Sequence, residues 1–167
     1  TKTEASYIPT QKISLYLSVI KKDNFELVVQ KATELGVTHI IPVLSERSLK
    51  KNIPFERLHK IATEASEQCG RGDIPLISEV ILLSDAISLL PQETKAIVCA
   101  MGDKSLAAFF TKEKLPDVSL FIGPEGGWGD SDEALFTTSK LTKCSLGNTV
   151  LRAETAAITA CALVSLL

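Results

Sequence analysis

VSLFIGPEGGWGDSDEALF, residues 118–136, changes character in its middle. The apolar run 118–123 is typical of a buried strand and ends in the pentapeptide Gly-Pro-Glu-Gly-Gly at 123–127. A helix is predicted shortly after it, at 131–140. Glycine lets the backbone approach a ligand closely, so this stretch is a candidate binding loop; a tight strand-to-helix turn is the alternative interpretation.

Outward from this stretch, apolar runs rich in branched residues alternate with amphipathic segments. Further strands are predicted at 13–20, 37–44, 75–83, 95–101 and 143–147, and further helices at 24–35, 54–69, 85–90, 104–111 and 155–167. This alternation predicts an α/β fold whose mostly parallel sheet carries helices on both faces. Ligands of such sheets bind beyond the carboxyl ends of the strands, where the glycine turn is expected to lie.

Single residues mark the ends of the first two helices. Asp23 can cap the helix at 24–35 and Gly36 can end it, while Pro54 suits the first turn of the next helix. The last helix, TAAITACALVSLL, has no charged residue. A helix that is uncharged on every side must be covered either by its own domain or by another subunit, and the sequence leaves both open.

Composition narrows the class of protein. The chain has 167 residues, 45% hydrophobic and 23% charged, which suits one globular domain. It has neither a run of about 18 apolar residues nor a signal-like N-terminus, so a cytoplasmic location is expected. The four cysteines, Cys69, Cys99, Cys144 and Cys161, are widely spaced, which favours reduced thiols in packing roles over disulfides or a metal site.

Charge is distributed unevenly along the chain. Residues 1–75 hold 11 Lys and Arg against 9 Asp and Glu, and residues 76–167 hold 7 against 11, for a net charge of -2 overall. A polyanion would therefore meet the first half more readily, although a solvated surface with chance asymmetry fits the numbers equally well.

Several kinds of site are excluded by the motifs. The glycine turn is neither a phosphate-binding P-loop nor a dinucleotide fingerprint, and His39 and His59 fall within a strand and a helix, where structural roles are favoured. A second loop, SLGNTVLRAETA at 145–156, lies between the last strand and the last helix. Two such loops at neighbouring strand ends predict a pocket of backbone amides and apolar side chains, which suits an adenosine better than a polyphosphate.

These segments carry a family resemblance. IGPEGGW, SLGNTVLRAETAA, ATELGVTHIIPVLSERS and EASEQCGR occur in an order and spacing similar to those of the RsmE ribosomal RNA methyltransferases of the SPOUT superfamily, over about residues 13–167. The resemblance implies a C-terminal deep trefoil knot, a homodimer formed through the knot region, and S-adenosyl-L-methionine as cofactor. It also implies methylation of N3 of a uracil, U1498 by the family's numbering, in 16S rRNA of the small ribosomal subunit.

The family also has an N-terminal PUA-like domain, which has no counterpart in this sequence. Residues 1–12 are therefore expected to be a linker remnant from that domain, and residues 13–167 the SPOUT methyltransferase domain. The sequence departs from the family pattern at Cys69, Gly129 and Ala153, where serine, a capping serine or threonine, and threonine are frequent. The missing cap at Gly129 is expected to pass to Asp130 or Ser131.

The resemblance assigns site residues at matching positions. The cofactor-binding set is Met101, Gly102, Gly123, Pro124, Glu125, Gly127, Leu146, Gly147, Leu151, Arg152 and Thr155. The catalytic candidates are Arg152, Glu154 and Glu125, and the RNA-binding candidates are Arg47, Gln68 and Arg71. No metal is expected.

Alternatives remain open for these roles. Arg152 is expected to stabilise charge developing on the uracil, but it can instead form a salt bridge to Glu154. Glu125 is a candidate base, but it can equally cap the helix that follows it. Two other functions also fit the sequence: a non-catalytic RNA-binding or ribosome-assembly domain with a SPOUT fold, and a SPOUT methyltransferase acting on tRNA.

Overall fold

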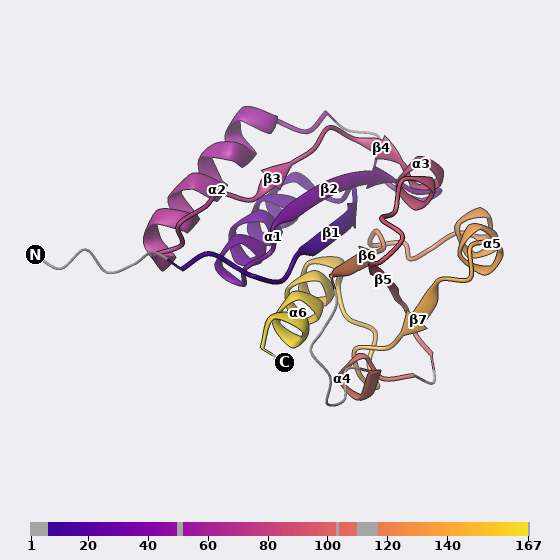
Figure 1. The fold of residues 1–167 in the computed structure, drawn as a ribbon. Coiled ribbons are helices and arrows are strands. Elements are labelled where there is room, and N and C mark those ends of the chain that lie inside the picture. The colour runs from indigo at the N-terminus through magenta and orange to yellow at the C-terminus, as the bar shows by residue number, and fades with distance from the viewer. Residues whose placement is uncertain (1–6, 50–51, 103, 110–116, 167) are drawn as a thin grey trace, which may run out of the picture.

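The computed structural model describes residues 7–49, 52–102, 104–109 and 117–166. They form a central sheet with helices on both faces (Figure 1). The strands are β1 (Ile13–Ser18), β2 (His39–Leu44), β3 (Leu76–Ile77), β4 (Ile81–Leu82), β5 (Lys95–Cys99), β6 (Val118–Ile122) and β7 (Thr142–Cys144). The helices are α1 (Lys22–Glu34), α2 (Phe55–Cys69), α3 (Leu83–Ser88), α4 (Leu106–Phe109), α5 (Asp130–Thr138) and α6 (Ala153–Ser165).

The strands run in the order β3-β2-β1-β6-β5-β7, with β4 also joined to β2. Every strand pairing in the described part of the chain is parallel. The prediction of an α/β fold with a largely parallel sheet is therefore confirmed. Strand β6 lies between β1 and β5, and all five of its residues are buried.

Alternation along the strands supplies a separate core on each face of the sheet. Leu15 and Leu17 of β1 join the core beneath α1, α2 and α6, whereas Tyr16 joins the core beneath α3 and α5. On this second face Tyr16 stacks on Phe121 of β6, with ring centroids 4.4 Å apart. Since burial of a large apolar side chain stabilises by roughly 1.5–3 kcal/mol, the two cores fix β6 from both sides.

One predicted strand is divided. The run at 75–83 forms β3 and β4, two residues each, which pair with the two ends of β2. Leu76 and Leu82 are 57% and 53% exposed, so this segment lies at the margin of the sheet, where apolar residues do not guarantee a continuous strand. The helix predicted at 104–111 is found at 106–109; residues 110 and 111 lie outside the described residues.

The predicted helix ends are correct in part. Gly36 ends α1 as expected, with φ of 81° and its N–H donated to the carbonyl of Thr33. Asp23 is not the N-cap, because α1 begins at Lys22 and Asp23 lies within its first turn. Pro54 precedes α2 as its N-cap residue instead of lying in the first turn.

Residues 7–12, which were expected to form part of a linker, are attached to the sheet. The N–H of Lys12 donates to the carboxylate of Asp117 at 3.0 Å, and Tyr7 pairs with Arg71 in an isolated parallel bridge. The first six residues lie outside the described part of the chain.

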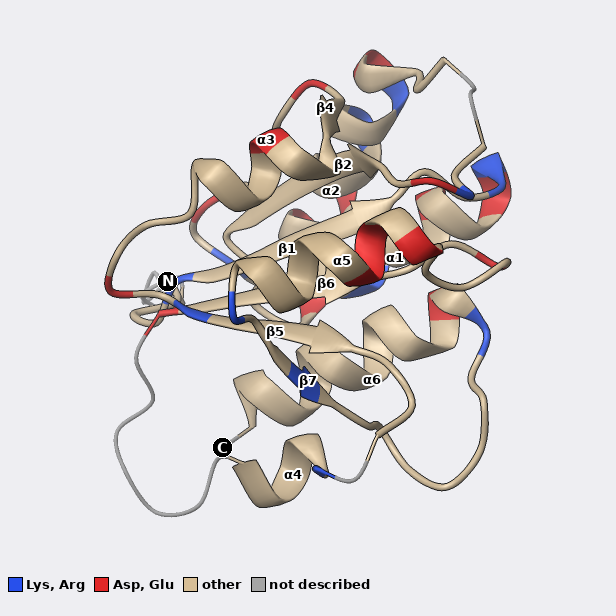
Figure 2. Ribbon diagram, turned by 90° about the vertical axis from the view of Figure 1, so that its right-hand side faces the viewer, with Lys and Arg blue, Asp and Glu red and all other residues tan. Residues whose placement is uncertain are grey.

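Helix α6 is covered unequally on its two sides. Its buried residues, Ala157, Cys161 and Val164 among them, face the core shared with α1, β1 and β6. Thr159 and Ala162 on the other side are only partly buried. Glu154 is the single charged residue of the helix, so most of its length is uncharged (Figure 2).

The cysteines differ in accessibility. Burial raises the pKa of the Cys99 and Cys144 thiols and raises that of Cys161 to about 12, so these three groups are protonated and unreactive at neutral pH. Cys69, in contrast, is exposed at the end of α2, so the packing role expected for it is wrong.

We therefore expect one fast-reacting thiol in the native protein. Ellman's reagent should label about one thiol per chain, and replacement of Cys69 by serine should remove that reaction, because the other thiols are shielded from solvent. Unfolding in guanidinium should expose the remaining three. Rapid reaction of a second thiol in the native protein would contradict the packing described for β5, β7 and α6.

Candidate functional site

The two glycine loops follow β6 and β7, which pair with the two sides of β5. The segments that follow these strands begin at Gly123, Ala100 and Ser145, respectively. Carboxyl ends of parallel strands lie at the same edge of a sheet, so all three segments leave on one side. The prediction that the two glycine loops follow neighbouring strands is wrong, because β5 lies between β6 and β7.

Hydrogen bonds tie these three segments together. Ser145 donates its N–H to the carbonyl of Lys104 at 2.7 Å, and Leu106 donates its N–H to the carbonyl of Ser145 at 2.9 Å. On the other side, the indole N–H of Trp128 donates to the carbonyl of Cys99 at 3.2 Å. The segment after β5 is therefore held between the segments after β6 and β7.

Glycine is required in these loops for two different reasons. Gly127 and Gly147 have φ of 70° and 141°, which residues with a side chain rarely adopt. Gly123 instead makes room for Trp128, because a Cβ there would lie 3.1 Å from the indole ring. No other described atom lies within 4 Å of an ideal Cβ at Gly127 or Gly147, so the space beside both residues is open.

Arg152 and Glu154 lie at the start of α6, directly after the second loop. Arg152 is the N-cap residue and is exposed, and Glu154 lies in the first turn and is half-buried. The salt bridge between them, considered from the sequence, does not form in the structure. Oε2 of Glu154 is buried without a hydrogen-bond partner among the described residues, so this carboxylate retains capacity to accept a proton or a hydrogen bond.

Glu125 contacts a different helix from the one considered. Its carboxylate accepts a hydrogen bond from the N–H of Lys21 at 3.1 Å, at the start of α1, and does not cap α5. This contact joins the glycine turn to the segment after β1. It also supplies α1 with an acidic partner at its N-terminus that the local sequence does not reveal.

Among the RNA-binding candidates, Arg47 lies against the glycine turn. Its Nη1 donates to the carbonyl of Gly126 at 3.1 Å, and the rest of the side chain is exposed. Gln68 and Arg71 are not brought to this place. They lie at and beyond the end of α2, which runs back toward the amino ends of the strands (Figure 1).

Arg71 is also deeply buried. Its side chain is 2% exposed and donates to both oxygens of Asp73 at 2.7 and 2.9 Å, and to the carbonyl of Thr33 at 2.9 Å. This geometry corrects the expectation that Arg71 is a surface RNA contact: the guanidinium holds the segment after α2 against the end of α1. Contact of Arg71 with RNA finds no support in its position.

One hydrogen-bonded group near the glycine turn is not predicted from the sequence, although Gly129 is singled out there for its missing cap. Glu46, Gly129 and Asp132 form a hydrogen-bonded group between the segment after β2 and the start of α5. An acid three residues after Gly129 is a local signal of helix capping, and it could have indicated Asp132. Glu46 has no such signal, because its partner lies far away in the sequence. The cap expected at Asp130 or Ser131 is not found, since Gly129 is the N-cap residue.

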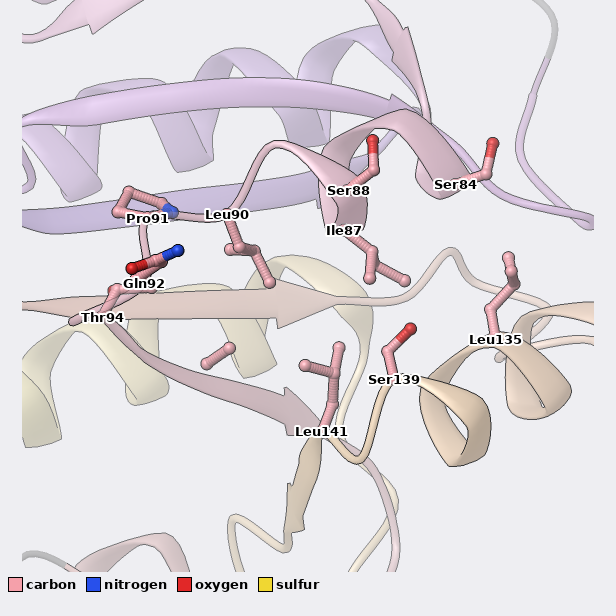
Figure 3. Close-up of a pocket in the computed structure, with 11 residues that line it drawn as sticks. Ser84, Ile87, Ser88, Leu90, Pro91, Gln92, Thr94, Leu135, Ser139 and Leu141 are labelled. Atoms are coloured by element: carbon pink, nitrogen blue, oxygen red, sulfur yellow. The ribbon is translucent and has the colours of Figure 1, made fainter.

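Two cavities lie outside the glycine loops. A cavity of about 580 Å³ is lined by Met101 and Gly102 of the predicted cofactor set, together with Lys104 and residues from α5 to β7. A second, of about 410 Å³, lies between α3, the segment leading into β5 and the end of α5 (Figure 3). Neither includes the glycine turn or residues 146–151, so in a single chain neither cavity encloses the two loops.

The described residues contain no group of three or more His, Cys, Asp or Glu side chains arranged to hold a metal ion. Within the same ranges, no helix has the length and apolar character that a membrane span requires.

A protein-family model for the RNA methyltransferase domain matches residues 7–165. The chain belongs to this RNA methyltransferase domain family. Ribosomal RNA small subunit methyltransferase E from Rickettsia conorii is 35% identical over 160 residues, which cover 93% of this chain and 64% of that protein. The chain thus spans less than two thirds of that relative. The resemblance to the RsmE family drawn from the motifs is confirmed.

Solved structures agree with this assignment. Ribosomal RNA small subunit methyltransferase E from Neisseria gonorrhoeae, bound to S-adenosyl methionine, has a TM-score of 0.84 and 29% identity, and the match covers 93% of this chain and 66% of that one. A Legionella pneumophila protein assigned as a methyltransferase, in complex with the same cofactor, has a TM-score of 0.81 and 35% identity over 92% and 65% of the two chains. The RNA methyltransferase domain therefore shares its sheet and helices with cofactor-bound relatives.

The Arg71–Asp73 pair makes stability depend on pH. Hydrogen bonds from Arg71 lower the pKa of Asp73 in the folded protein. A carboxyl group whose pKa is lower in the folded state stabilises at pH values above its unfolded pKa, and this contribution is lost as the pH falls through the folded pKa. Asp73→Asn should therefore lower the free energy of unfolding by roughly 1–3 kcal/mol at pH 7, because Arg71 stays buried without its anion.

Urea denaturation at pH 7 and near pH 3 tests this prediction. The difference between Asp73→Asn and the wild type should be smaller at the lower pH. As a control, Glu64→Gln breaks the exposed pair with Lys60 and should change stability by less than about 1 kcal/mol. An Asp73→Asn effect that is equal at both pH values would show that the ion pair is not its cause.

Proposed function

We propose that this chain is the catalytic domain of a cytoplasmic, S-adenosyl-L-methionine-dependent methyltransferase that methylates N3 of a uracil in 16S rRNA of the small ribosomal subunit. Family membership and the names of the relatives support the reaction and its RNA. The observation that carries the proposal is the joining of the segments after β5, β6 and β7, followed in the chain by Glu154, whose Oε2 has no hydrogen-bond partner among the described residues.

These loops suit the cofactor chemically. Residues 146–151 donate no backbone hydrogen bond within the described part of the chain, so their N–H groups are free to bind an adenosine. Leu146 and Leu151 add partly buried apolar surface, and the open space at Gly127 and Gly147 leaves room beside the backbone. The residues proposed to hold the cofactor are Met101, Gly102, Gly123, Pro124, Glu125, Gly127, Leu146, Gly147, Leu151, Arg152 and Thr155.

The main task of the protein is then alignment. S-adenosyl-L-methionine supplies an activated methyl group on a sulfonium when it is bound. Holding the two reacting atoms in line lowers the activation free energy by on the order of 7–11 kcal/mol. A positioned base raises the rate by roughly 10²–10⁴-fold, which corresponds to a barrier lower by about 3–5 kcal/mol. The hydrogen bonds that Ser145, Leu106 and Trp128 make at the ends of β5 and β7 serve the larger of these two effects, because they hold the beginnings of the loops.

Proton removal and charge stabilisation fall to the start of α6. The proton on uracil N3 must leave for attack to occur, and Glu154 offers a carboxylate oxygen that has no partner in the described part of the chain. Glu125 is the weaker candidate base, because its carboxylate already accepts the N–H of Lys21. Arg152 is exposed and free of an ion pair with Glu154, so its guanidinium can contact a uracil carbonyl that gains negative charge.

RNA contact is proposed for Arg47, which lies beside the cofactor loop, and for Gln68, which is exposed on α2. Within one chain Gln68 lies far along the sheet from the loops, so it would bind a more distant part of the RNA. Arg71, whose side chain is buried, is given no RNA contact here.

We also propose a homodimer formed through the C-terminal region and a deep trefoil knot, as the family resemblance implies. The partly buried, uncharged outer side of α6 supports the dimer, and Val150, in the loop before this helix, adds an apolar side chain that is 84% exposed. Burial of such a surface against a second copy would also exclude water from the nearby loops.

Calorimetric titration tests the cofactor assignment. S-adenosyl-L-methionine should bind about once per chain and more tightly than ATP, because the loops offer backbone amides and apolar surface but little positive charge. Gly147→Val should weaken binding at least about tenfold, since a β-branched residue strains the backbone at φ of 141°. Absence of binding by the folded protein would favour the non-catalytic RNA-binding alternative, and preference for ATP would refute the loop assignment.

Arg152→Ala tests the catalytic assignment. With small ribosomal subunits that lack the modification, the variant should lose at least about 10²-fold in methylation rate at saturating cofactor. Because Arg152 also belongs to the proposed cofactor set, cofactor affinity should fall as well, but by less than about tenfold, since the other residues of the set remain. Lys60→Ala, which removes an exposed cation on α2, provides the matched control. An equal loss of cofactor binding, or loss of folding, would contradict a role for Arg152 in the chemical step.

A further inference from the structure

The loop after β2 is joined to the start of α5 by two carboxylates, Glu46 and Asp132, which we call the clasp. Oε2 of Glu46 accepts hydrogen bonds from the N–H of Ser131 at 2.8 Å and from its hydroxyl at 2.6 Å. In the opposite direction, a carboxylate oxygen of Asp132 accepts the N–H of Glu46 at 3.1 Å. Each acid therefore binds the backbone of the other's segment.

Asp132 also closes the turn that leads into α5. Its other oxygen accepts the N–H of Gly129 at 2.9 Å, and the residue is only 2% exposed. The first N–H groups of a helix have no partner within the helix, and carboxylates near them are stabilised by the helix dipole. The carboxylates of Glu46 and Asp132 can therefore lie close together, because backbone N–H groups donate hydrogen bonds to both of them.

Gly129 makes this arrangement sterically feasible. An ideal Cβ at position 129 would lie 2.2 Å from Cδ of Glu46, well inside contact distance. The φ of Gly129 is -87°, which any residue can adopt, so glycine is needed for space and not for conformation. Position 129, where the family frequently has serine or threonine, is glycine in this chain, and Glu46 occupies the space that a side chain there would fill.

The clasp acts on the two elements assigned to RNA and cofactor. Arg47 directly follows Glu46 and donates from Nη1 to the carbonyl of Gly126 at 3.1 Å. A Cβ at Gly126 would lie 3.5 Å from Cβ of Arg47, so the side chain rests on the glycine turn. The hydrogen bonds of Glu46 with Ser131 and Asp132 therefore link the backbone from which Arg47 extends to the start of α5.

We propose that Glu46 and Asp132 are positioning residues for methyl transfer, which keep Arg47 at a fixed separation from the glycine turn at 123–127. The inference rests on the proposed function, because Arg47 is the RNA contact and the turn lines the cofactor. A displacement of about 1 Å between reacting groups can cost on the order of 10²-fold in rate, so a clasp of this kind affects turnover more than binding of the cofactor.

Three variants test the clasp. Glu46→Ala removes the acceptor, Glu46→Gln keeps an amide oxygen that can still accept from Ser131, and Gly129→Ala fills the space that Glu46 occupies. Glu64→Ala is the control, since Glu64 is an exposed acid on α2 that forms an ion pair with Lys60 and lies outside the clasp. Methylation of small ribosomal subunits, cofactor affinity and thermal midpoint are measured for each.

Glu46→Ala and Gly129→Ala should lower kcat at least about tenfold, with cofactor Kd within about threefold and a shift in Tm of less than about 5 °C. Glu46→Gln should recover part of the loss, and Glu64→Ala should match the wild type. Because Glu46 acts through Arg47, the double variant with Arg47→Ala should be no slower than Arg47→Ala alone. Additive losses, or full activity of Glu46→Ala, would overturn the proposal.

Amide hydrogen exchange separates this inference from the proposed function, because it requires no activity. In Glu46→Ala the N–H groups of residues 126–131 should exchange at least about tenfold faster, while those of β1 stay unchanged. A wild-type chain that binds no cofactor would refute the proposed function and leave exchange to decide on the clasp. Unchanged exchange at 126–131 would overturn the clasp even in an active enzyme.

Discussion

The burial of β6 between β1 and β5 is the constraint on which the rest of the structure depends. Five apolar or small residues are enclosed on both faces, so the strand has one position and one register. The chain must then leave the core at Gly123, and the glycine turn emerges where the ends of β5 and β7 also lie. Parallel pairing thus converts a local apolar run into a meeting point of three distant segments.

From this point, contacts spread over the edge of the sheet. The N–H of Lys21 binds the carboxylate of Glu125, and the guanidinium of Arg47 binds the carbonyl of Gly126. The segments after β1 and β2 therefore both contact the stretch 123–131, to which Glu46 also binds at Ser131. The second loop, at 145–152, is held mainly at its beginning, by the bonds of Ser145. One side of the site is therefore fixed by many bonds, and the other offers unbonded backbone groups.

How far the sequence predicts this structure depends on the range of the interactions. Apolar periodicity located the strands and helices, and Gly36 marked a helix end, because these signals are local. The partner of Glu125 and the interior position of Arg71 could not be predicted, since both depend on segments brought together by folding. The strand predicted at 75–83 is longer than the two short strands found there, because Leu76 and Leu82 are apolar yet exposed at the margin of the sheet. The site residues came from motif resemblance, and residue spacing alone would have yielded only the two loops.

The contact between Glu46 and Gly129 also bears on how sequences of this family diverge. A side chain larger than hydrogen at position 129 collides with Glu46, and loss of Glu46 first leaves the N–H of Ser131 without its acceptor. A Cβ at position 129 requires the carboxylate end of the Glu46 side chain to move away, so the two positions are coupled. Their identities should covary among relatives although they lie in different loops, and a serine at position 129 should accompany a different path for the side chain at position 46.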